Sequence, residues 1–318
     1  MQLRDPLRTS GLWAVTRTAA ALCSGVFEKA YLAKLSSKIC GSSAPAAELT
    51  GLAAELFMFA ALTVDDWLDN TPSRAGKSAV YFKHGPQSAV LAATCLTEAA
   101  HSALYKASTS VPETLRAQFL QSFQTAVLSI QAGQVCSLKH AEEPVESLAI
   151  VERLARQRCG NLIASTMSAG AYLSGNTELV PILAGAGTWL GIALQHRNDV
   201  QDFAVAFNQT TKSPLADLLN GQPNLVACYL FRAVPHMKPR ERQLLFDLHG
   251  RSRTTARQPL TKSEFLAVLE LSVKYDAAVH AGRRLCVCVQ RCRRALDRLA
   301  EQEGFDELND FLRLVTQP

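Results

Sequence analysis

The sequence predicts an all-α protein that folds as a single domain. Apolar residues recur at three-to-four spacing almost throughout, as in "ESLAIVERLARQRCGNLIASTMSAGAYL", and this spacing is typical of amphipathic helices. Sustained two-residue alternation, which half-buried strands show, is absent. A chain of 318 residues with 48% hydrophobic and 19% charged residues has a globular composition. It is long enough to bury a core that encloses a ligand cavity.

Turn-forming residues divide the chain into expected helices, roughly ten or more in number. Neither a long low-complexity linker nor a repeat of solenoid period is visible, so we expect one domain over 1–318. The breaks are 41–45, 70–78, 84–87, 109–114, 140–146, 174–181, 208–224 and 249–263.

Composition argues against several classes of protein. The longest apolar run, "VPILAGAGTWLGIAL", is shorter than a membrane span and rich in glycine, so we expect a buried helix and no stable membrane insertion. The net charge of +5 is spread along the chain, and no nucleic-acid signature is present. The basic stretch near the C-terminus is read as a solvated helix face, with an anionic partner as the alternative. The start lacks the pattern of a secretory signal and is expected to form an N-terminal helix.

The cysteines favour a cytoplasmic protein with reduced thiols. Nine cysteines are scattered along the chain, mostly in apolar helical contexts. The cluster of Cys286, Cys288 and Cys292 lacks the paired spacing of a structural zinc site. We expect core packing there, with metal or redox chemistry as the alternative.

Three aspartates at the end of an apolar helical run form the first candidate site. In "DDWLD", Asp65 and Asp69 are four residues apart and stack on one helix face, while Asp66 reaches only an edge of the same site. The apolar run continues into them without a break, so we expect them inside a buried helix and not at its start. Carboxylate oxygens select hard cations, and this pair suits Mg²⁺ that bridges to phosphate oxygens.

A second group repeats the spacing far along the chain. Asn198, Asp199 and Asp202, in "NDVQD", also follow a mostly apolar stretch. Two such groups on hydrophobic helices are stronger support than one. If the two helices face each other across a bundle, the groups form opposed walls around a diphosphate.

These segments resemble the trans-isoprenyl diphosphate synthases, the polyprenyl synthetase family, from about residue 37 to 225. "DDWLD" and "NDVQD" resemble the two aspartate-rich motifs of that family. "GQVCSL", "RCGNLI" and "GIALQ" lie between them in the order that the family shows. The resemblance implies an isoprenoid-synthase helical bundle with an N-terminal region over 1–36, a core over 37–225 and C-terminal helices over 226–318.

The resemblance also implies the chemistry and the partners. Three Mg²⁺ ions held by the two motifs would grip an allylic prenyl diphosphate and help its diphosphate to leave. In elongating members, isopentenyl diphosphate then attacks the allylic cation. A homodimer is expected as in the family.

The half of the site that binds the allylic diphosphate matches the family well. Arg74 matches the first arginine after the first motif, and Lys212 matches a lysine that contacts the leaving group. Arg158 replaces a lysine by another cation, and Cys159 replaces a threonine. Gln134 lies in the segment that contains the Gly-Gln pair. Asn in place of Asp in the second motif is expected to weaken magnesium binding without abolishing it.

The half that binds isopentenyl diphosphate matches poorly. Ile39, Gly41 and Ala75 stand where the family has arginines, and Met58 stands where it has His or Gln. An apolar residue or glycine does not replace the bidentate grip of arginine on a diphosphate. Each lost contact is expected to cost about 1.5–3 kcal/mol of binding.

This asymmetry favours an enzyme that ionises an allylic diphosphate alone. Of the polar groups that would hold a second substrate, only Lys38 and Gln195 remain. The leading hypothesis is therefore a class I terpene synthase (a lyase) on a prenyl-synthase fold. The alternatives are a chain-elongating synthase of the geranylgeranyl or farnesyl type, a prenyltransferase to a non-isoprenoid acceptor, and a non-catalytic subunit. Ala206 replaces the last ligand of the terpene-synthase pattern, so the signature is a hybrid.

Residues before the first motif predict the depth of the pocket. Aromatic residues four or five positions before the motif stop chain growth in the family, and these positions hold Ala61 and Ala60. Bulk comes only from the neighbouring Phe57 and Phe59, so a deep pocket and a C20 substrate are favoured over C15. Trp67 is read either as core or as a shield for the cation.

Overall fold

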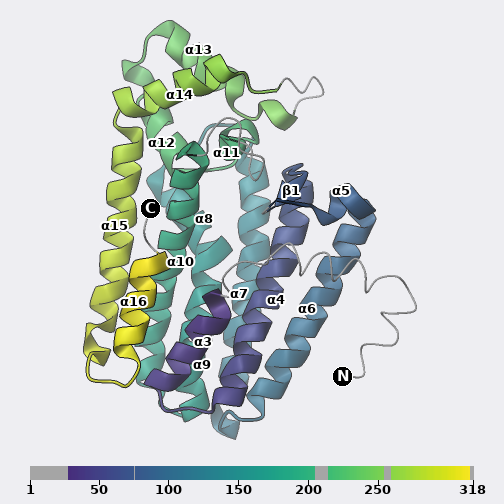
Figure 1. Cartoon of the computed structure of the whole chain (residues 1–318), viewed down its shortest axis with the longest axis vertical. Coiled ribbons are helices and arrows are strands. Elements are labelled where there is room, and N and C mark those ends of the chain that lie inside the picture. The colour runs from purple at the N-terminus through teal and green to yellow at the C-terminus, as the bar shows by residue number, and fades with distance from the viewer. Residues whose placement is uncertain (1–27, 75, 205–213, 254–258, 316–318) are drawn as a thin grey trace. The chain divides into compact units, whose positions relative to one another are not determined.

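The computed structural model describes residues 28–74, 76–204, 214–253 and 259–315 and is almost entirely helical (Figure 1). The predicted all-α fold is confirmed, with more than ten α-helices in these ranges. Several sequence positions of interest lie outside the described residues: Ala75, Ala206, Lys212 and 1–27 of the expected N-terminal region.

The elements follow one another along the chain with short connections. The α-helices are α3 (Glu28–Ile39), α4 (Ala44–Leu68), α5 (Val80–His84), α6 (Pro86–Ser108), α7 (Glu113–His140), α8 (Leu148–Ala155), α9 (Asn161–Ser174), α10 (Leu179–Ala204), α11 (Ala216–Leu219), α12 (Leu225–Arg232), α13 (Pro239–Leu248), α14 (Lys262–Lys274), α15 (Ala277–Leu296) and α16 (Phe305–Val315). A π-helical turn, η1 (Arg156–Gly160), joins α8 to α9. Short 3₁₀ turns are η2 (Val234–His236), η3 (Arg251–Arg253) and η4 (Asp297–Leu299).

A two-stranded hairpin interrupts the helices after α4. Strand β1 (Ser73–Arg74) pairs antiparallel with β2 (Lys77–Ser78), and Arg74 lies opposite Lys77. The hairpin falls within the break expected at 70–78. The hairpin places the backbone of Arg74 next to the C-terminal end of α4.

The described residues fall into two compact units. The first contains the described residues of 1–127, together with 162–185 and 296–308. The second contains the described residues of 128–161, 186–295 and 309–318.

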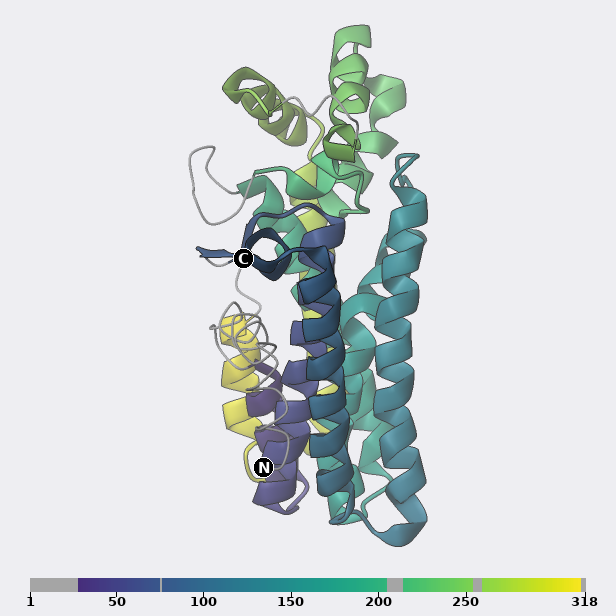
Figure 2. The ribbon, with the colours of Figure 1, turned by 90° about the vertical axis from the view of Figure 1, so that its right-hand side faces the viewer.

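In the first unit, α4 packs between α3 and α6, and α4 and α6 run side by side (Figures 1 and 2). Small residues permit the close approach of α3 to its neighbours. A Cβ on Gly51 of α4 would lie 2.6 Å from the Cα of Ala30, and a Cβ on Gly170 of α9 would collide with the backbone carbonyl of Ser36. The Glu55 carboxylate, 3% exposed, accepts hydrogen bonds from backbone N–H groups in the first turn of α3. Burial raises the pKa of Glu55.

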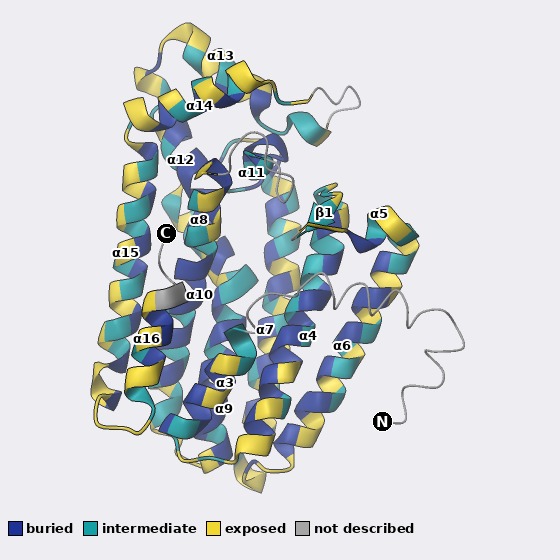
Figure 3. Cartoon of the chain, in the orientation of Figure 1, coloured by how far each residue is buried: buried dark blue, intermediate teal, exposed yellow. Residues whose placement is uncertain are grey.

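The apolar faces of α4, α5 and α6 form a core of this unit, and each helix turns an exposed face outward (Figure 3). Alanines supply much of this core, which lets the helices approach closely. The buried members are Phe59, Ala60, Val80, Ala89, Ala92, Ala93 and Leu96.

The second unit has a large core around α12. Leu230 and Phe231 of α12 are buried with apolar side chains of α14 and α15, among them Val268 and Ala281. A smaller cluster joins α8, α10 and α15 through Ala155, Ile192, Ala193, Leu285 and Cys288. These contacts hold the C-terminal half of α10 in place.

Two helices, α4 and α10, are long and apolar enough by length and composition to cross a membrane. In their most apolar windows, 61% and 50% of the residues are buried inside the protein. Core helices pass the same test, so this finding is weak support for a span.

We expect replacement of Gly170 by Ala to lower the free energy of unfolding by about 1–3 kcal/mol, because the added methyl collides with backbone of α3. Gly185 of α10 is the matched control, since a Cβ there meets no atom within 4 Å. Gly185→Ala should raise stability by up to about 1 kcal/mol through helix propensity. Urea unfolding measures the free energy of unfolding of each variant. The same change in both variants would contradict the explanation by packing.

Candidate functional site

The first aspartate motif lies in the last turn of α4 and at its C-cap. The helix ends at Leu68, and Asp69 is the C-cap residue. Asn70 follows with a φ of 51°, and its N–H donates to the backbone carbonyl of Trp67 (3.1 Å). The N–H of Thr71 donates to the backbone carbonyl of Asp66 (2.8 Å). This is a Schellman motif, with Asn in the left-handed position that usually holds glycine. Asp65 and Asp66 lie within α4 and far from its start, as expected, but the motif occupies the last turn of the helix because Asn70 and the proline at 72 end it.

Three carboxylates at the C-terminal end of a helix are electrostatically unfavourable. The helix dipole places negative charge at this end, and α4 has no basic residue in its last turn. Arg74 supplies a cation from strand β1: its Nε and Nη2 donate to Oδ1 of Asp66 at 2.9 and 2.6 Å. Nη2 also lies 3.9 Å from Oδ2 of Asp65.

Asp66 is the most buried of the three aspartates, with 1% of its surface exposed. Burial raises its pKa, and Arg74 opposes part of that rise while the nearby charge of Asp65 adds to it. The sequence had placed Asp66 at the edge of the site and Arg74 on the diphosphate. The structure instead pairs the two, and a guanidinium with five N–H donors can contact a diphosphate as well.

The donor set at this end of α4 fits a hard divalent cation. Asp65 and Asp69 are half-buried and offer only oxygen ligands, which Mg²⁺ prefers. A cation there would also offset the unfavourable charge of the helix end. Their assignment as magnesium ligands, with Asp66 beside them, stays a prediction.

In the second motif, Asp199 connects α10 to the start of α12. Its Oδ1 accepts from Nε2 of Gln195 (2.9 Å), and its Oδ2 accepts from the backbone N–H of Leu225 (2.9 Å). Asn224, the N-cap residue of α12, donates its side-chain amide to the Asp199 carbonyl (3.1 Å). Asp199 is 1% exposed. Asn224 was not predicted as a site residue; the signal that could have indicated it is an asparagine directly before an apolar helix.

Asp202 holds the segment that contains α11. Its Oδ1 accepts from the N–H of Ala216 (3.2 Å) and its Oδ2 accepts from the N–H of Asp217 (3.1 Å). The side chain is completely buried. The carboxylates of Asp199 and Asp202 therefore bind backbone N–H groups that begin helices, a role that the metal hypothesis did not include.

Asn198, in contrast, is exposed. The two motifs belong to different units. The prediction that they form opposed walls around a diphosphate stays a prediction.

The π-helical turn η1 carries Arg158 and Cys159, both half-buried. The Cys159 thiol donates to Oε1 of Gln195 (3.3 Å), so this glutamine links η1 to Asp199. Gly191 of α10 permits this arrangement, because a Cβ there would lie 2.6 Å from the Cα of Gly160. Gln195 was expected to contact a second substrate, and the structure gives it a positioning role within α10.

Gln134 of α7 lies in the second unit next to Gly133, which faces η1. A Cβ on Gly133 would lie 2.9 Å from the Cβ of Gln157 and 3.1 Å from the Cγ of Arg158. The amide nitrogen of Gln134 is buried and has no hydrogen-bond partner among the described residues.

The segment from Lys38 to Gly41, where the family resemblance implied a site for the second diphosphate, has other roles in this structure. Lys38 forms ion pairs with Glu307 and Glu303 at 2.5 and 3.8 Å, and these partners raise its pKa, Glu307 most strongly. Ile39 is 3% exposed and belongs to the core. Gly41 ends α3 with a φ of 62°, a conformation that an arginine rarely adopts.

The predicted pocket residues divide between core and surface. Phe57 and Ala60 are buried, and Met58 and Ala61 are half-buried. Phe57 packs edge-on against His101, with ring centroids 5.1 Å apart. Trp67 is 37% exposed, so it is not a core residue. The deep pocket stays a prediction.

The family model described as polyprenyl synthetase matches residues 28–263. A geranylgeranyl diphosphate synthase of Sulfolobus acidocaldarius is 22% identical over 246 residues, which is 77% of this chain and 73% of the relative. An all trans-polyprenyl-diphosphate synthase of Mus musculus is 29% identical over 218 residues, 64% of this chain. The chain spans about half, 52%, of the length of that mouse relative.

Solved structures show the same fold. A geranylgeranyl pyrophosphate synthetase from Pyrococcus horikoshii superposes with a TM-score of 0.83 at 21% identity, over 96% of this chain and 90% of that one. A geranylgeranyl pyrophosphate synthase from Corynebacterium glutamicum, complexed with isoprenyl diphosphate and magnesium, has a TM-score of 0.83 at 17% identity, over 97% and 90%.

Replacement of Arg74 by Met should lower stability by about 1–3 kcal/mol at neutral pH, because Asp66 then stays buried without its cation. The raised pKa of Asp66 means that the folded state holds this proton more tightly than the unfolded chain. Ionisation therefore costs stability as pH rises above the ordinary pKa of about 4. Without Arg74 this pKa rises further, so the loss should grow toward neutral pH.

Urea unfolding in chelator at several pH values measures this effect. Asp66→Asn in the Arg74→Met background should restore stability and remove the pH dependence. Arg313→Met is the control, because its pair with Asp310 is exposed and should contribute less than about 1 kcal/mol. A pH-independent loss in the Arg74 variant would contradict the role given to Asp66.

Proposed function

Because the chain belongs to the polyprenyl synthetase family, we propose that it is a prenyltransferase that joins an allylic prenyl diphosphate to isopentenyl diphosphate. The observation that carries the proposal is the family match over 28–263, which includes both aspartate motifs. The relatives named above are themselves prenyl diphosphate synthases. They favour the chain-elongating alternative over the terpene synthase that the sequence alone had favoured.

The proposed reaction breaks the bond between the allylic carbon and the diphosphate oxygen. The diphosphate leaves with the electron pair, the double bond of isopentenyl diphosphate forms the new carbon–carbon bond, and a proton is lost. Bound Mg²⁺ would supply Lewis-acid stabilisation of the charge on the leaving group. Asp65 and Asp69 would hold an ion at the end of α4 in the first unit. In the second unit, the exposed Asn198 would offer an amide oxygen as a metal ligand from α10.

The cations of the chain would hold the substrate in position. Arg74 stays beside the first motif because Asp66 accepts two of its N–H groups. Arg158 is fixed by the π-helical turn, which packs against α7 and α10. Both guanidiniums offer bidentate donors to phosphate oxygens. Lys212 would add a third cation.

A terpene synthase remains the second candidate, and one observation favours it. Lys38 is paired with a glutamate, Ile39 is a core residue, and Gly41 follows the end of α3 with a positive φ. This segment therefore lacks the arginines that would bind a second diphosphate. Without such a grip, isopentenyl diphosphate would bind weakly and the cation would react internally or with water.

The preferred substrate is proposed to be C20, with C15 as the alternative, since Ala60 and Ala61 are small residues at the positions where aromatic side chains would stop chain growth. The number of Mg²⁺ ions, the homodimer and the cytoplasmic location stay predictions.

Incubation with Mg²⁺ and C10, C15 or C20 allylic diphosphates, with and without isopentenyl diphosphate, tests the proposal. We expect a longer prenyl diphosphate only when both substrates are present, identified by mass spectrometry. A hydrocarbon or alcohol from one allylic substrate would support the terpene synthase. Release of neither product, from protein shown to be folded, would contradict both.

Asp65→Asn and Asp69→Asn should each lower the rate by about 100-fold or more, because the charge that holds the metal is removed while the shape is kept. Asp297→Asn is the matched control, since Asp297 is exposed in η4 and should leave the rate unchanged. Rates are compared over a magnesium titration. An unchanged rate and magnesium requirement in both motif variants would show that the end of α4 does not bind the metal.

A further inference from the structure

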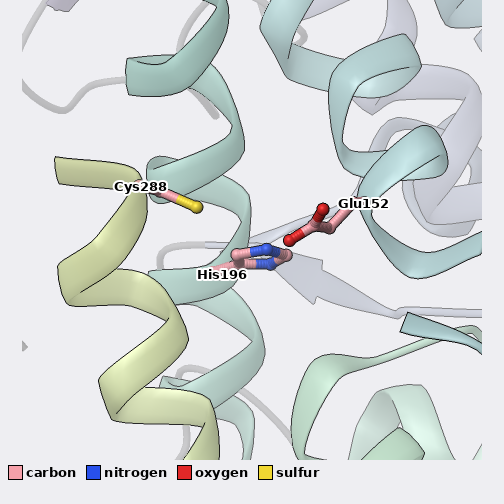
Figure 4. A group of neighbouring side chains, drawn as sticks. All are labelled: Glu152, His196 and Cys288. Atoms are coloured by element: carbon pink, nitrogen blue, oxygen red, sulfur yellow. The ribbon is translucent and has the colours of Figure 1, made fainter. Parts of the chain in front are cut away.

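Three potential metal ligands from different helices meet in the second unit, and none of them is a carboxylate that the proposed reaction uses. They are Glu152 of α8, His196 of α10 and Cys288 of α15, and their ligand atoms all lie within 4.8 Å of one another. Figure 4 shows the three side chains directed toward one another. Cys288 belongs to the cysteine cluster for which the sequence left metal chemistry open.

His196 has no other evident role. Its side chain is completely buried, and neither ring nitrogen has a hydrogen-bond partner among the described residues. The nearest carboxylate outside the group, Oδ2 of Asp199, lies 3.8 Å from Nδ1, which is beyond hydrogen-bond distance. A buried imidazole without partners is uncommon and calls for a ligand.

The other two members are also suited to coordinate an ion. Cys288 is 0% exposed, and Glu152 keeps its Oε1 on Arg284 of α15. The second oxygen of Glu152 forms no hydrogen bond or ion pair with the described residues, so the carboxylate can bind an ion without giving up Arg284. This ion pair also fixes the Glu152 side chain toward α15.

We propose that Glu152, His196 and Cys288 bind a zinc ion. A thiolate, an imidazole and a carboxylate form a mixed sulfur, nitrogen and oxygen set, which selects Zn²⁺ over Mg²⁺. Tetrahedral bonds of about 2.0–2.3 Å place ligand atoms about 3.3–3.8 Å apart, so small side-chain rotations close the site. Three protein ligands leave the fourth position for water.

Binding of zinc requires the Cys288 thiol to lose its proton. Burial raises the pKa of the Cys288 thiol to about 11, so the thiol is protonated at neutral pH in the metal-free protein. On binding, the sulfur–hydrogen bond breaks, the zinc–sulfur bond forms and the proton goes to solvent. The thiolate and Glu152 then offset the charge of the ion, while Arg284 keeps its pair with Glu152.

Zinc at this site would tie α8, α10 and α15 together. His196 precedes Asn198 of the second aspartate motif by two residues. The ion would therefore fix the part of α10 that carries this motif. This inference goes beyond the proposed prenyl transfer, and its test requires no prenyl substrate.

The test uses the full chain, stripped of metal by chelator and kept in excess Mg²⁺ to occupy carboxylate sites. We expect one tightly bound zinc per chain by elemental analysis, and a sulfur-to-cobalt charge-transfer band when Co²⁺ is used. Cys288→Ser and His196→Gln should lower zinc affinity by more than about 100-fold in competition with a chromophoric chelator. Cys292→Ser is the matched control, a buried thiol one turn further along α15, and should keep both affinity and band.

X-ray absorption of the zinc-loaded wild-type chain keeps the proposal testable if a variant does not fold. We expect one sulfur at about 2.3 Å together with nitrogen and oxygen ligands. Absence of stoichiometric zinc, a shell without sulfur, or unchanged affinity in Cys288→Ser would overturn the proposal.

Discussion

The concentration of negative charge at the C-terminal end of α4 is the constraint on which the first unit's site depends. Three aspartates meet there, where the helix dipole is also negative, and the helix itself supplies no cation. Arg74, on the short hairpin, offsets part of this negative charge. Its pairing with the buried Asp66 fixes the hairpin against the helix. The half-buried Asp65 and Asp69 are left with the chemistry that suits a divalent ion. The same arrangement thus serves the fold and the proposed reaction.

Periodicity and turn residues were sufficient to predict an all-α fold, because helical spacing depends only on local sequence. The first motif was found from the four-residue spacing of Asp65 and Asp69, but its place at the end of α4 depends on backbone hydrogen bonds of Asn70 and Thr71. The burial of Asp66 and its pairing with Arg74 could not be predicted, because both follow from the path of the hairpin. His196 and Cys288 are 92 residues apart in the sequence (288 − 196), and no local pattern indicates that they meet.

The second motif shows that closely spaced aspartates can have a structural role as well as a metal-binding one. Asp199 and Asp202 are conspicuous as carboxylates, yet each accepts backbone N–H groups at the start of a following helix. Such contacts hold the N-terminal ends of α11 and α12 against the last turns of α10. Asn198 is exposed and takes no part in these hydrogen bonds. An asparagine in place of aspartate at this position therefore changes the motif without disturbing the contacts of Asp199 and Asp202. Family membership and these contacts together favour an intact helical scaffold.

The π-helical turn η1 changes which residues of α8 and η1 face the same neighbouring helix. On a regular α-helix, residues eight positions apart point about 80° away from each other. Glu152 and Gly160 are separated by eight positions, yet both face α10: Glu152 approaches His196, and Gly160 touches Gly191. The wider π turn absorbs the extra residue and brings the two positions back into phase. Loss of a single residue from η1 would thus rotate one contact with α10 out of alignment while leaving the composition of the helix almost unchanged.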